Sequence, residues 1–201
     1  MKIRMPVLAM FLIAGSHSSL NAQAVQPPLV VIDAGHGGAD AGATTAGIVE
    51  KNLTLAIAND VASALRQAGF RVLLTRTGDA TVELRERAAA ASTADVAAFV
   101  SIHAGASADP TLRGTRIYMP PNDDASRALA VAVSGSLRAA GDLPVLAPEE
   151  ANFLVFRGVS RPRILLEVGY VSNAQDAALI DTAAHRATLA AALVAAVPHG
   201  R

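Results

Sequence analysis

The sequence contains no cysteine among its 201 residues. This absence excludes disulfide bonds, and it also excludes the thiolate ligands that many structural zinc sites use. Any metal site in this chain must therefore use histidine and carboxylate side chains. A domain of this length buries enough surface to be stable without a disulfide, so the absence of cysteine does not exclude an exported protein.

The chain also lacks an excess of either charge. It has 17 Lys and Arg residues against 17 Asp and Glu residues, and such a balance gives no indication of binding to nucleic acid or to an anionic membrane surface. Beyond the first residues it also lacks a membrane-spanning run, which takes about 20 apolar residues. The alanine-rich C-terminal stretch is interrupted by His185 and Arg186.

The first residues have the pattern of a secretory signal peptide. Lys2 and Arg4 provide a positive start, and residues 7–14 form a short apolar run. Residues 22–24 (Ala-Gln-Ala) have the small-x-small pattern that a signal peptidase recognises, which predicts cleavage after Ala24. The alternative is an uncleaved anchor, but the apolar run is too short for a permanent span.

Removal of a signal peptide over residues 1–24 leaves 201 − 24 = 177 residues, the size of a single domain. The leader carries two basic residues and no acidic one, so the remaining chain has 15 basic and 17 acidic residues and a net charge of −2. We expect residues 25–28 to be a linker and residues 29–201 to form one catalytic domain. We further expect a monomer that is exported to the periplasm or outside the cell, with no stable membrane insertion after cleavage.

Apolar runs and helical repeats alternate along this domain, which predicts an α/β fold with a mixed, mostly parallel sheet flanked by helices. A helix beginning near Glu50 is indicated by apolar residues at helical spacing, and Gly69 ends it. A long loop is expected over 143–152, which contains two prolines. The remaining expected strands are 29–33, 70–75, 96–102, 114–119, 153–156 and 163–168, and the remaining helices are 82–91, 124–140 and 172–197 with a break near Asp181.

Ionisable residues interrupt the Ala/Val/Leu background at the ends of three of these strands. His36 lies in a glycine-rich turn after the first strand, His103 closes another, and Glu167 lies near the end of the strand 163–168. Open α/β sheets bind ligands at the carboxyl ends of their strands, so these side chains are expected to meet. Glu50 joins them because it opens the helix after the glycine-rich turn.

His36, Glu50 and His103 together form a plausible zinc site with two histidines and one carboxylate, leaving a position for water. Glu167 would then carry the proton. Each residue also has a structural explanation: strand-end histidines are often only hydrogen-bonded, and Glu50 can complement the helix dipole. Glu167 is the hardest to explain structurally, because an unpartnered buried carboxylate is costly.

The order of these motifs resembles the N-acetylmuramoyl-L-alanine amidase family of zinc cell-wall hydrolases (the amidase-3 type). The resemblance runs from about residue 30 to residue 197. It is carried first by residues 31–38, with Asp40 and Gly42 at the positions that the family pattern has next. The other matching segments are Glu50-Lys51-Asn52-Leu53, Leu74-Thr75-Arg76, Leu84 with Arg87, Ser101-Ile102-His103-Ala104 and residues 166–173. Four motifs in the right order over one domain are far more specific than any one of them.

The resemblance implies hydrolysis of the amide bond between N-acetylmuramic acid and L-alanine in peptidoglycan. It implies Zn²⁺ held by His36, Glu50 and His103, with Glu167 as the catalytic residue. Asp33 is a candidate to orient His36 through a hydrogen bond, and a turn cap is the equal alternative. The chain departs from the family pattern modestly: Gly105 stands where Asn is usual, and Val168 and Tyr170 replace Thr and Phe.

Two arginines just before the Glu167 strand are candidates for substrate binding. Arg161 and Arg163 are two residues apart, so strand alternation would put both on one face, where they could bind a stem-peptide carboxylate. A solvated edge is the alternative. For the whole protein, the alternatives to the amidase are a zinc peptidase that cuts within the stem peptide and a non-catalytic wall-binding module.

Overall fold

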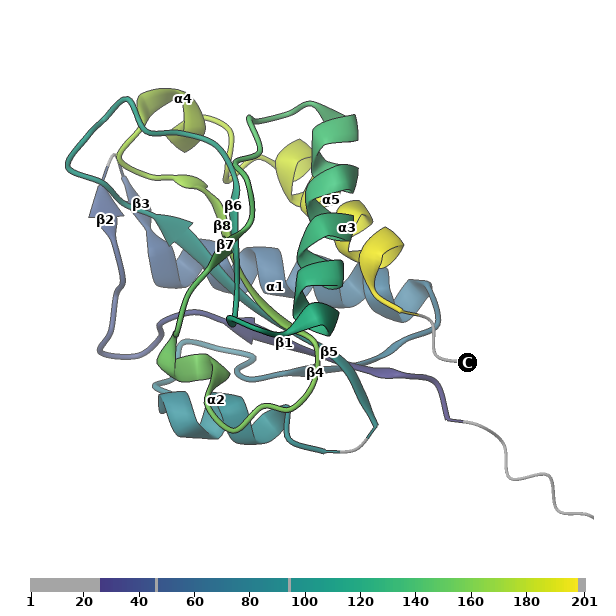
Figure 1. Ribbon diagram of the computed structural model, residues 1–201. Coiled ribbons are helices and arrows are strands. Elements are labelled where there is room, and N and C mark those ends of the chain that lie inside the picture. Colours follow the sequence, from purple (N-terminus) through teal and green to yellow (C-terminus); the bar gives the residue numbers. More distant parts are fainter. Residues whose placement is uncertain (1–25, 46, 94, 199–201) are drawn as a thin grey trace, which may run out of the picture.

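The computed structural model describes residues 26–45, 47–93 and 95–198, so the expected signal peptide lies outside the described residues. The centre of the fold is a six-stranded sheet in the order β4-β1-β5-β8-β6-β7 (Figure 1). A two-stranded hairpin, β2-β3, stands apart from it. The strands are β1 (Leu29–Ala34), β2 (Thr44–Thr45), β3 (Ile48–Val49), β4 (Arg71–Leu74), β5 (Val96–Gly105), β6 (Arg116–Met119), β7 (Glu149–Glu150) and β8 (Arg163–Tyr170).

The expected mixed, mostly parallel sheet is confirmed. β4, β1, β5 and β8 run parallel, β6 is antiparallel to β8, and β7 is parallel to β6. The carboxyl ends of β1, β5 and β8 therefore lie at one edge of the sheet. Because these three strands are neighbours, residues at their ends are within side-chain reach of one another.

Helices cover both faces of the sheet (Figure 1). α1, α3 and α5 pack with one face into the larger core, and α2 and η1 pack with the other face into the smaller core. Among the described residues, no helix combines the length and apolar character that a membrane span requires. The helices are α1 (Glu50–Gln67), α2 (Leu84–Ala90), α3 (Asp124–Ala140), the 3₁₀ helix η1 (Leu154–Phe156), α4 (Ala174–Ala177) and α5 (Ala183–Ala196).

α1 illustrates how the sequence positions the site. Leu53, Ile57, Val61 and Leu65 recur every fourth residue and are all buried in the larger core, so one stripe of the helix faces the sheet. This packing holds the first residue of the helix, Glu50, over the edge where the strands end. A glutamate in the first turn also suits the helix dipole.

The structure differs from the sequence-based expectations in three local respects. The expected strand 153–156 is wrong: residues 154–156 form the 3₁₀ helix η1, which buries Val155 and Phe156 in the smaller core. The expected loop 143–152 contains the short edge strand β7, which pairs with β6. The β2-β3 hairpin was not expected, since two-residue strands show no alternation. The expected helix 124–140 and the break near Asp181 are confirmed.

Candidate metal centre

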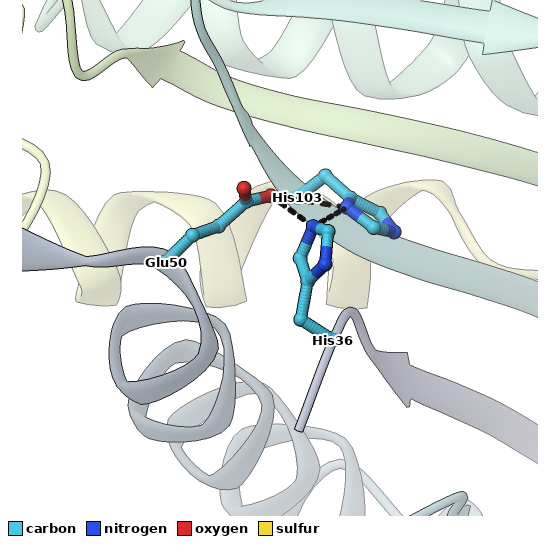
Figure 2. Close-up of side chains that lie close together, drawn as sticks. All are labelled: His36, Glu50 and His103. Carbon is cyan, nitrogen blue, oxygen red and sulfur yellow. Dashed lines mark hydrogen bonds and ion pairs between the residues drawn. The ribbon is translucent and has the colours of Figure 1, made fainter. Parts of the chain in front are cut away.

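Three side chains converge at the carboxyl edge of the sheet (Figure 2). His36 comes from the loop after β1, Glu50 from the start of α1, and His103 from β5. The Glu50 Oε1 atom lies 3.0 Å from His36 Nε2 and 3.0 Å from His103 Nδ1, and the two nitrogens are 3.2 Å apart. The three donor atoms thus surround one point, as the ligands of a single cation would.

The loop that carries His36 has an unusual backbone. His36 has a φ of 61°, in the left-handed region that residues other than glycine rarely adopt. Gly42, at φ 66°, lies directly against the ligands: a Cβ there would be 2.6 Å from both Glu50 Oε2 and His36 Cδ2. A side chain at position 42 would therefore push the two ligands out of place, and only glycine fits.

Glu50 is 3% exposed, yet the site favours its ionised form. Burial raises the pKa of Glu50, but hydrogen bonds from His103 and His36 and from the Ala104 and Ala43 amides outweigh it and hold the pKa far below its usual range. The Ala104 amide donates to Oε1 at 2.9 Å and the Ala43 amide to Oε2 at 2.8 Å. An ionised carboxylate between two imidazoles is a donor set suited to a divalent metal.

Asp40, rather than Asp33, is the carboxylate beside the His36 ring. Asp40 Oδ2 lies 2.8 Å from His36 Nδ1, the nitrogen on the far side of the ring from the other ligands. A carboxylate in this place fixes which ring nitrogen remains free to bind a metal. In the sequence, Asp40 stands out only as part of a motif. Its spacing of four residues from His36 is the one feature that could have indicated the contact.

Asp33 does not bond to the His36 ring, because both of its carboxylate oxygens bond to other groups; its link to His36 runs through Arg87, which also donates to the His36 carbonyl. Oδ1 accepts hydrogen bonds from Thr75 Oγ1 at 2.6 Å and from Arg87 at 2.7 Å, and Oδ2 accepts one from Ser101 Oγ at 2.6 Å. Asp33 is completely buried beneath the loop. Its carboxylate thus joins β1 to β5, to the end of β4 and to α2.

Two buried arginines hold the His36 loop from below. Arg87 donates to the carbonyls of Ala34 at 2.6 Å and His36 at 2.7 Å. Arg76 donates to the carbonyls of Ala34 at 2.9 Å and Gly35 at 3.0 Å. Because three successive carbonyls are bound in this way, the loop backbone has little freedom. The sequence reasoning noted both arginines as motif residues but assigned them no role.

Glu167 lies beside this cluster on β8. It is paired in register with His103 of β5 and with Arg116 of β6. Its Oε2 atom is buried and has no hydrogen-bond partner among the described residues. Burial raises the pKa of Glu167 above its usual value, although a hydrogen bond from Tyr170 and the charge of Arg116 oppose the shift. The carboxylate is therefore able to take up a proton at a pH where an exposed glutamate would not.

A cavity of about 350 Å³ opens onto these side chains. His36, Glu50, His103 and Glu167 form its polar side. Leu84 from α2 and Leu154 from η1, which are 47% and 50% exposed, contribute to its apolar side. Both are large apolar side chains left open to solvent at the cavity, which is typical of a surface that binds a ligand.

Arg161 and Arg163 lie at the opposite end of β8 from Glu167. Arg161 precedes the strand, so the expected alternation does not relate the two, and Arg163 is ion-paired with Asp123 at 2.8 Å. Arg163 and Arg157 line a second cavity, which shares Phe153 with the cavity at the metal site. Arg157 was missed by the sequence reasoning because it stands in an irregular segment after η1.

Comparison with known proteins gives consistent matches. The family model described as N-acetylmuramoyl-L-alanine amidase matches residues 30–199. A probable cell wall amidase, LytH of Staphylococcus epidermidis, is 33% identical over 193 residues, covering 90% of this chain and 64% of that protein. This chain thus spans slightly less than two thirds of the length of that relative.

Two solved structures resemble the whole domain. The catalytic domain of CwlV, an N-acetylmuramoyl-L-alanine amidase from Bacillus (Paenibacillus) polymyxa var. colistinus, is 35% identical with a TM-score of 0.78, covering 84% of this chain and 95% of that chain. The N-acetylmuramoyl-L-alanine amidase AmiC2 of Nostoc punctiforme is 36% identical with a TM-score of 0.77, covering 83% and 93% respectively. The likeness therefore includes the strands and loops that carry the candidate metal centre.

Proposed function

The chain belongs to the N-acetylmuramoyl-L-alanine amidase family, and from this premise we propose that it hydrolyses the amide bond between N-acetylmuramic acid and L-alanine in peptidoglycan. The observation that carries the proposal is the convergence of His36, Glu50 and His103 beside Glu167 in one cavity. The substrate places the action of the protein at the cell wall, outside the cytoplasm. This location agrees with the secretory pattern of the first residues.

The donor set supports zinc as the metal. Two imidazole nitrogens and one carboxylate oxygen are ligands that zinc accepts, and three protein ligands leave a position open, as hydrolytic zinc sites do. The chain contributes no thiolate, and the cluster has too few oxygen donors for calcium. When bound, a zinc ion makes water a better nucleophile at neutral pH and polarises the carbonyl of the amide.

Glu167 is proposed to move the proton. Its unpartnered Oε2 atom accepts the proton from the attacking water, and the same oxygen then delivers it to the departing alanine nitrogen. The raised pKa of Glu167 favours the first step, because it makes the carboxylate a stronger base toward the attacking water. Asp40 holds His36 in the orientation that directs Nε2 toward the metal.

The arginine-lined cavity is proposed to receive the stem peptide. The peptide carries carboxylates, and Arg157 and Arg163 supply positive charge next to the metal cavity. A further cavity that shares His36 and His103 is lined by Asp40 and Glu83, and its one arginine, Arg87, is already ion-paired with Asp33, so this cavity is less suited to an anion. Arg163 remains a proposed carboxylate contact, although its bond to Asp123 must be shared or replaced. Arg161 is less well supported as a carboxylate contact, because it precedes β8 and does not line the arginine-lined cavity.

The test is to digest purified peptidoglycan with the zinc-loaded protein and to identify the fragments by mass spectrometry. Release of intact stem peptides with a free L-alanine amine, leaving unsubstituted N-acetylmuramic acid, is the expected result. Cleavage inside the stem peptide would instead make the protein a zinc peptidase. Binding to peptidoglycan without any cleavage would make it a wall-binding module. The Arg157→Ala/Arg163→Ala variant should raise KM more than it lowers kcat.

A further inference from the structure

A local irregularity of β8 begins next to Glu167. β5 and β8 are in register at His103 and Glu167, but two residues further along β5, Gly105 pairs with Tyr170, three residues along β8. β8 thus carries one extra residue, which is a β-bulge. Side chains alternate between the two faces of a regular strand, so residues 167 and 170, three positions apart, would lie on opposite faces. The extra residue of the bulge places Tyr170 on the same face as Glu167. The bulge includes Gly169, whose φ is 155°.

The ring of Tyr170 lies directly on the backbone of Gly105. A Cβ at position 105 would be 2.6 Å from Tyr170 Cε1 and 2.9 Å from Cζ, which no side chain tolerates without moving the ring. Tyr170 is 4% exposed, so the ring is enclosed on its other sides as well. The bulge and the missing side chain at position 105 together create a slot in which this tyrosine is held.

The slot holds the Tyr170 side chain on the same face of β8 as the Glu167 carboxylate, with which its hydroxyl interacts. Their hydrogen bond opposes the effect of burial on the pKa of Glu167, and burial together with the carboxylate raises the pKa of Tyr170 strongly. The raised pKa of Tyr170 keeps its hydroxyl protonated, so the hydroxyl is the donor. The other carboxylate oxygen, Oε2, remains without a partner among the described residues.

We propose that Tyr170 is a positioning residue for Glu167, and that Gly105 provides the space in which Tyr170 reaches it. The hydroxyl holds one side of the carboxylate, which leaves Oε2 as the oxygen available to a proton from the attacking water. Without the hydroxyl, the side chain of Glu167 would be free to rotate away from the reacting atoms. This inference rests on the proposed amidase function, because it assigns Glu167 the role of proton carrier.

The kinetic test compares Tyr170→Phe with Tyr118→Phe, a control on the neighbouring strand β6. Tyr170→Phe keeps the ring but removes the hydroxyl, so zinc content and KM should stay as in the parent. Loss of a hydrogen bond to a charged group should lower kcat about tenfold. Gly105→Ala should lower kcat similarly by displacing the ring, and the double variant should be no worse than either, since both act through one contact. An unchanged kcat in Tyr170→Phe, or a fall accompanied by loss of zinc, would overturn the proposal.

A spectroscopic test does not depend on amidase activity. The chain has no tryptophan and two tyrosines, so Tyr118→Phe leaves Tyr170 as the only tyrosine. A carboxylate that accepts a hydrogen bond from a tyrosine hydroxyl quenches the emission of the ring. Adding Glu167→Gln to Tyr118→Phe should therefore raise the tyrosine fluorescence. Unchanged emission would overturn the contact even if peptidoglycan were cleaved, whereas a rise with no cleavage by the parent would contradict the amidase function and keep the contact.

Discussion

The two halves of the site differ in how completely their polar groups are bonded. Beneath His36, Arg76 and Arg87 bind three successive loop carbonyls, and every oxygen of Asp33 has a partner. Around Glu167, one carboxylate oxygen is buried without any partner among the described residues. Both regions are buried and both contain carboxylates, so burial alone does not explain the contrast.

The contrast follows from what each half must do. A metal ligand has to keep one charge state and one position, and full hydrogen bonding of its surroundings achieves both. A proton carrier must change its charge state in each cycle. Additional donors on Glu167 would stabilise its ionised form and lower its pKa, which would make it a weaker base toward the attacking water. An incompletely bonded carboxylate is therefore the functional state of Glu167, while the same feature beneath His36 would be a defect.

The largest expected effect comes from the ligands themselves. His36→Ala and His103→Ala each remove one of the three donors, and we expect both variants to lose bound zinc and all measurable hydrolysis. Elemental analysis of the purified proteins gives the zinc content directly, and the parent should contain about one zinc per chain. His185→Ala is the control, because this buried histidine contacts the Val168 carbonyl away from the cluster. Full zinc retention in both ligand variants would contradict the assignment.

Glu167→Gln should separate catalysis from metal binding. The glutamine keeps the size of the side chain but cannot shuttle a proton, so the rate should fall by roughly 10²–10⁴-fold. Zinc content should match the parent, and the melting temperature should not fall, because the buried oxygen without a partner contributes no bond to lose. Activity close to that of the parent would mean that another group carries the proton.

Arg87→Met should act on the His36 half of the site, and its main effect should be a lower free energy of unfolding. It leaves Asp33 as a buried carboxylate without its charged partner, which costs about 3–5 kcal/mol in comparable buried pairs. Denaturant unfolding measures this loss, and zinc affinity should fall as the His36 loop gains freedom. Arg85→Met, on the exposed side of the same helix, is the matched control and should change the free energy of unfolding by about 0.5 kcal/mol or less. Equal stability of the two variants would show that the loop does not depend on Arg87.

Asp40→Asn should have the smallest effect of the four. Removing a carboxylate beside a metal-bound histidine typically costs 10–100-fold in metal affinity, and we expect about tenfold here. We expect the lower end of this range because the Asp40 side chain is 64% exposed, so water can replace its hydrogen bond to His36. A competition titration with a zinc chelator gives the affinity, with Asp124→Asn at a distant helix start as the control. An unchanged affinity would mean that the loop backbone alone orients His36.

Much of the fold and the ligand set could be predicted from local patterns. The helix over 124–140 and the start of α1 at Glu50 follow from apolar spacing and terminal residues, which act over a few neighbours. The candidate ligands stood out because ionisable residues interrupt an apolar background at strand ends and at a helix start, and because their motifs follow the order of a known family. The prediction of a strand over 153–156 failed because tertiary packing decides that segment: residues 154–156 form η1, which buries Val155 and Phe156 in the smaller core. The ion pair of Arg163 with Asp123, from another part of the chain, could not be read from local patterns either.

The sequence by itself determined which residues could bind a metal and at which edge of the sheet they would meet, because strand ends and helix starts are set by short-range patterns. Only the tertiary structure decided that Asp40 rather than Asp33 supports His36, and that Tyr170 faces Glu167. Alternation along an isolated strand would have placed Tyr170 on the opposite face. The bulge that reverses it exists only in the pairing with β5, where Gly105 leaves room for the ring. A register between two strands depends on both, so neither segment of sequence contains it alone.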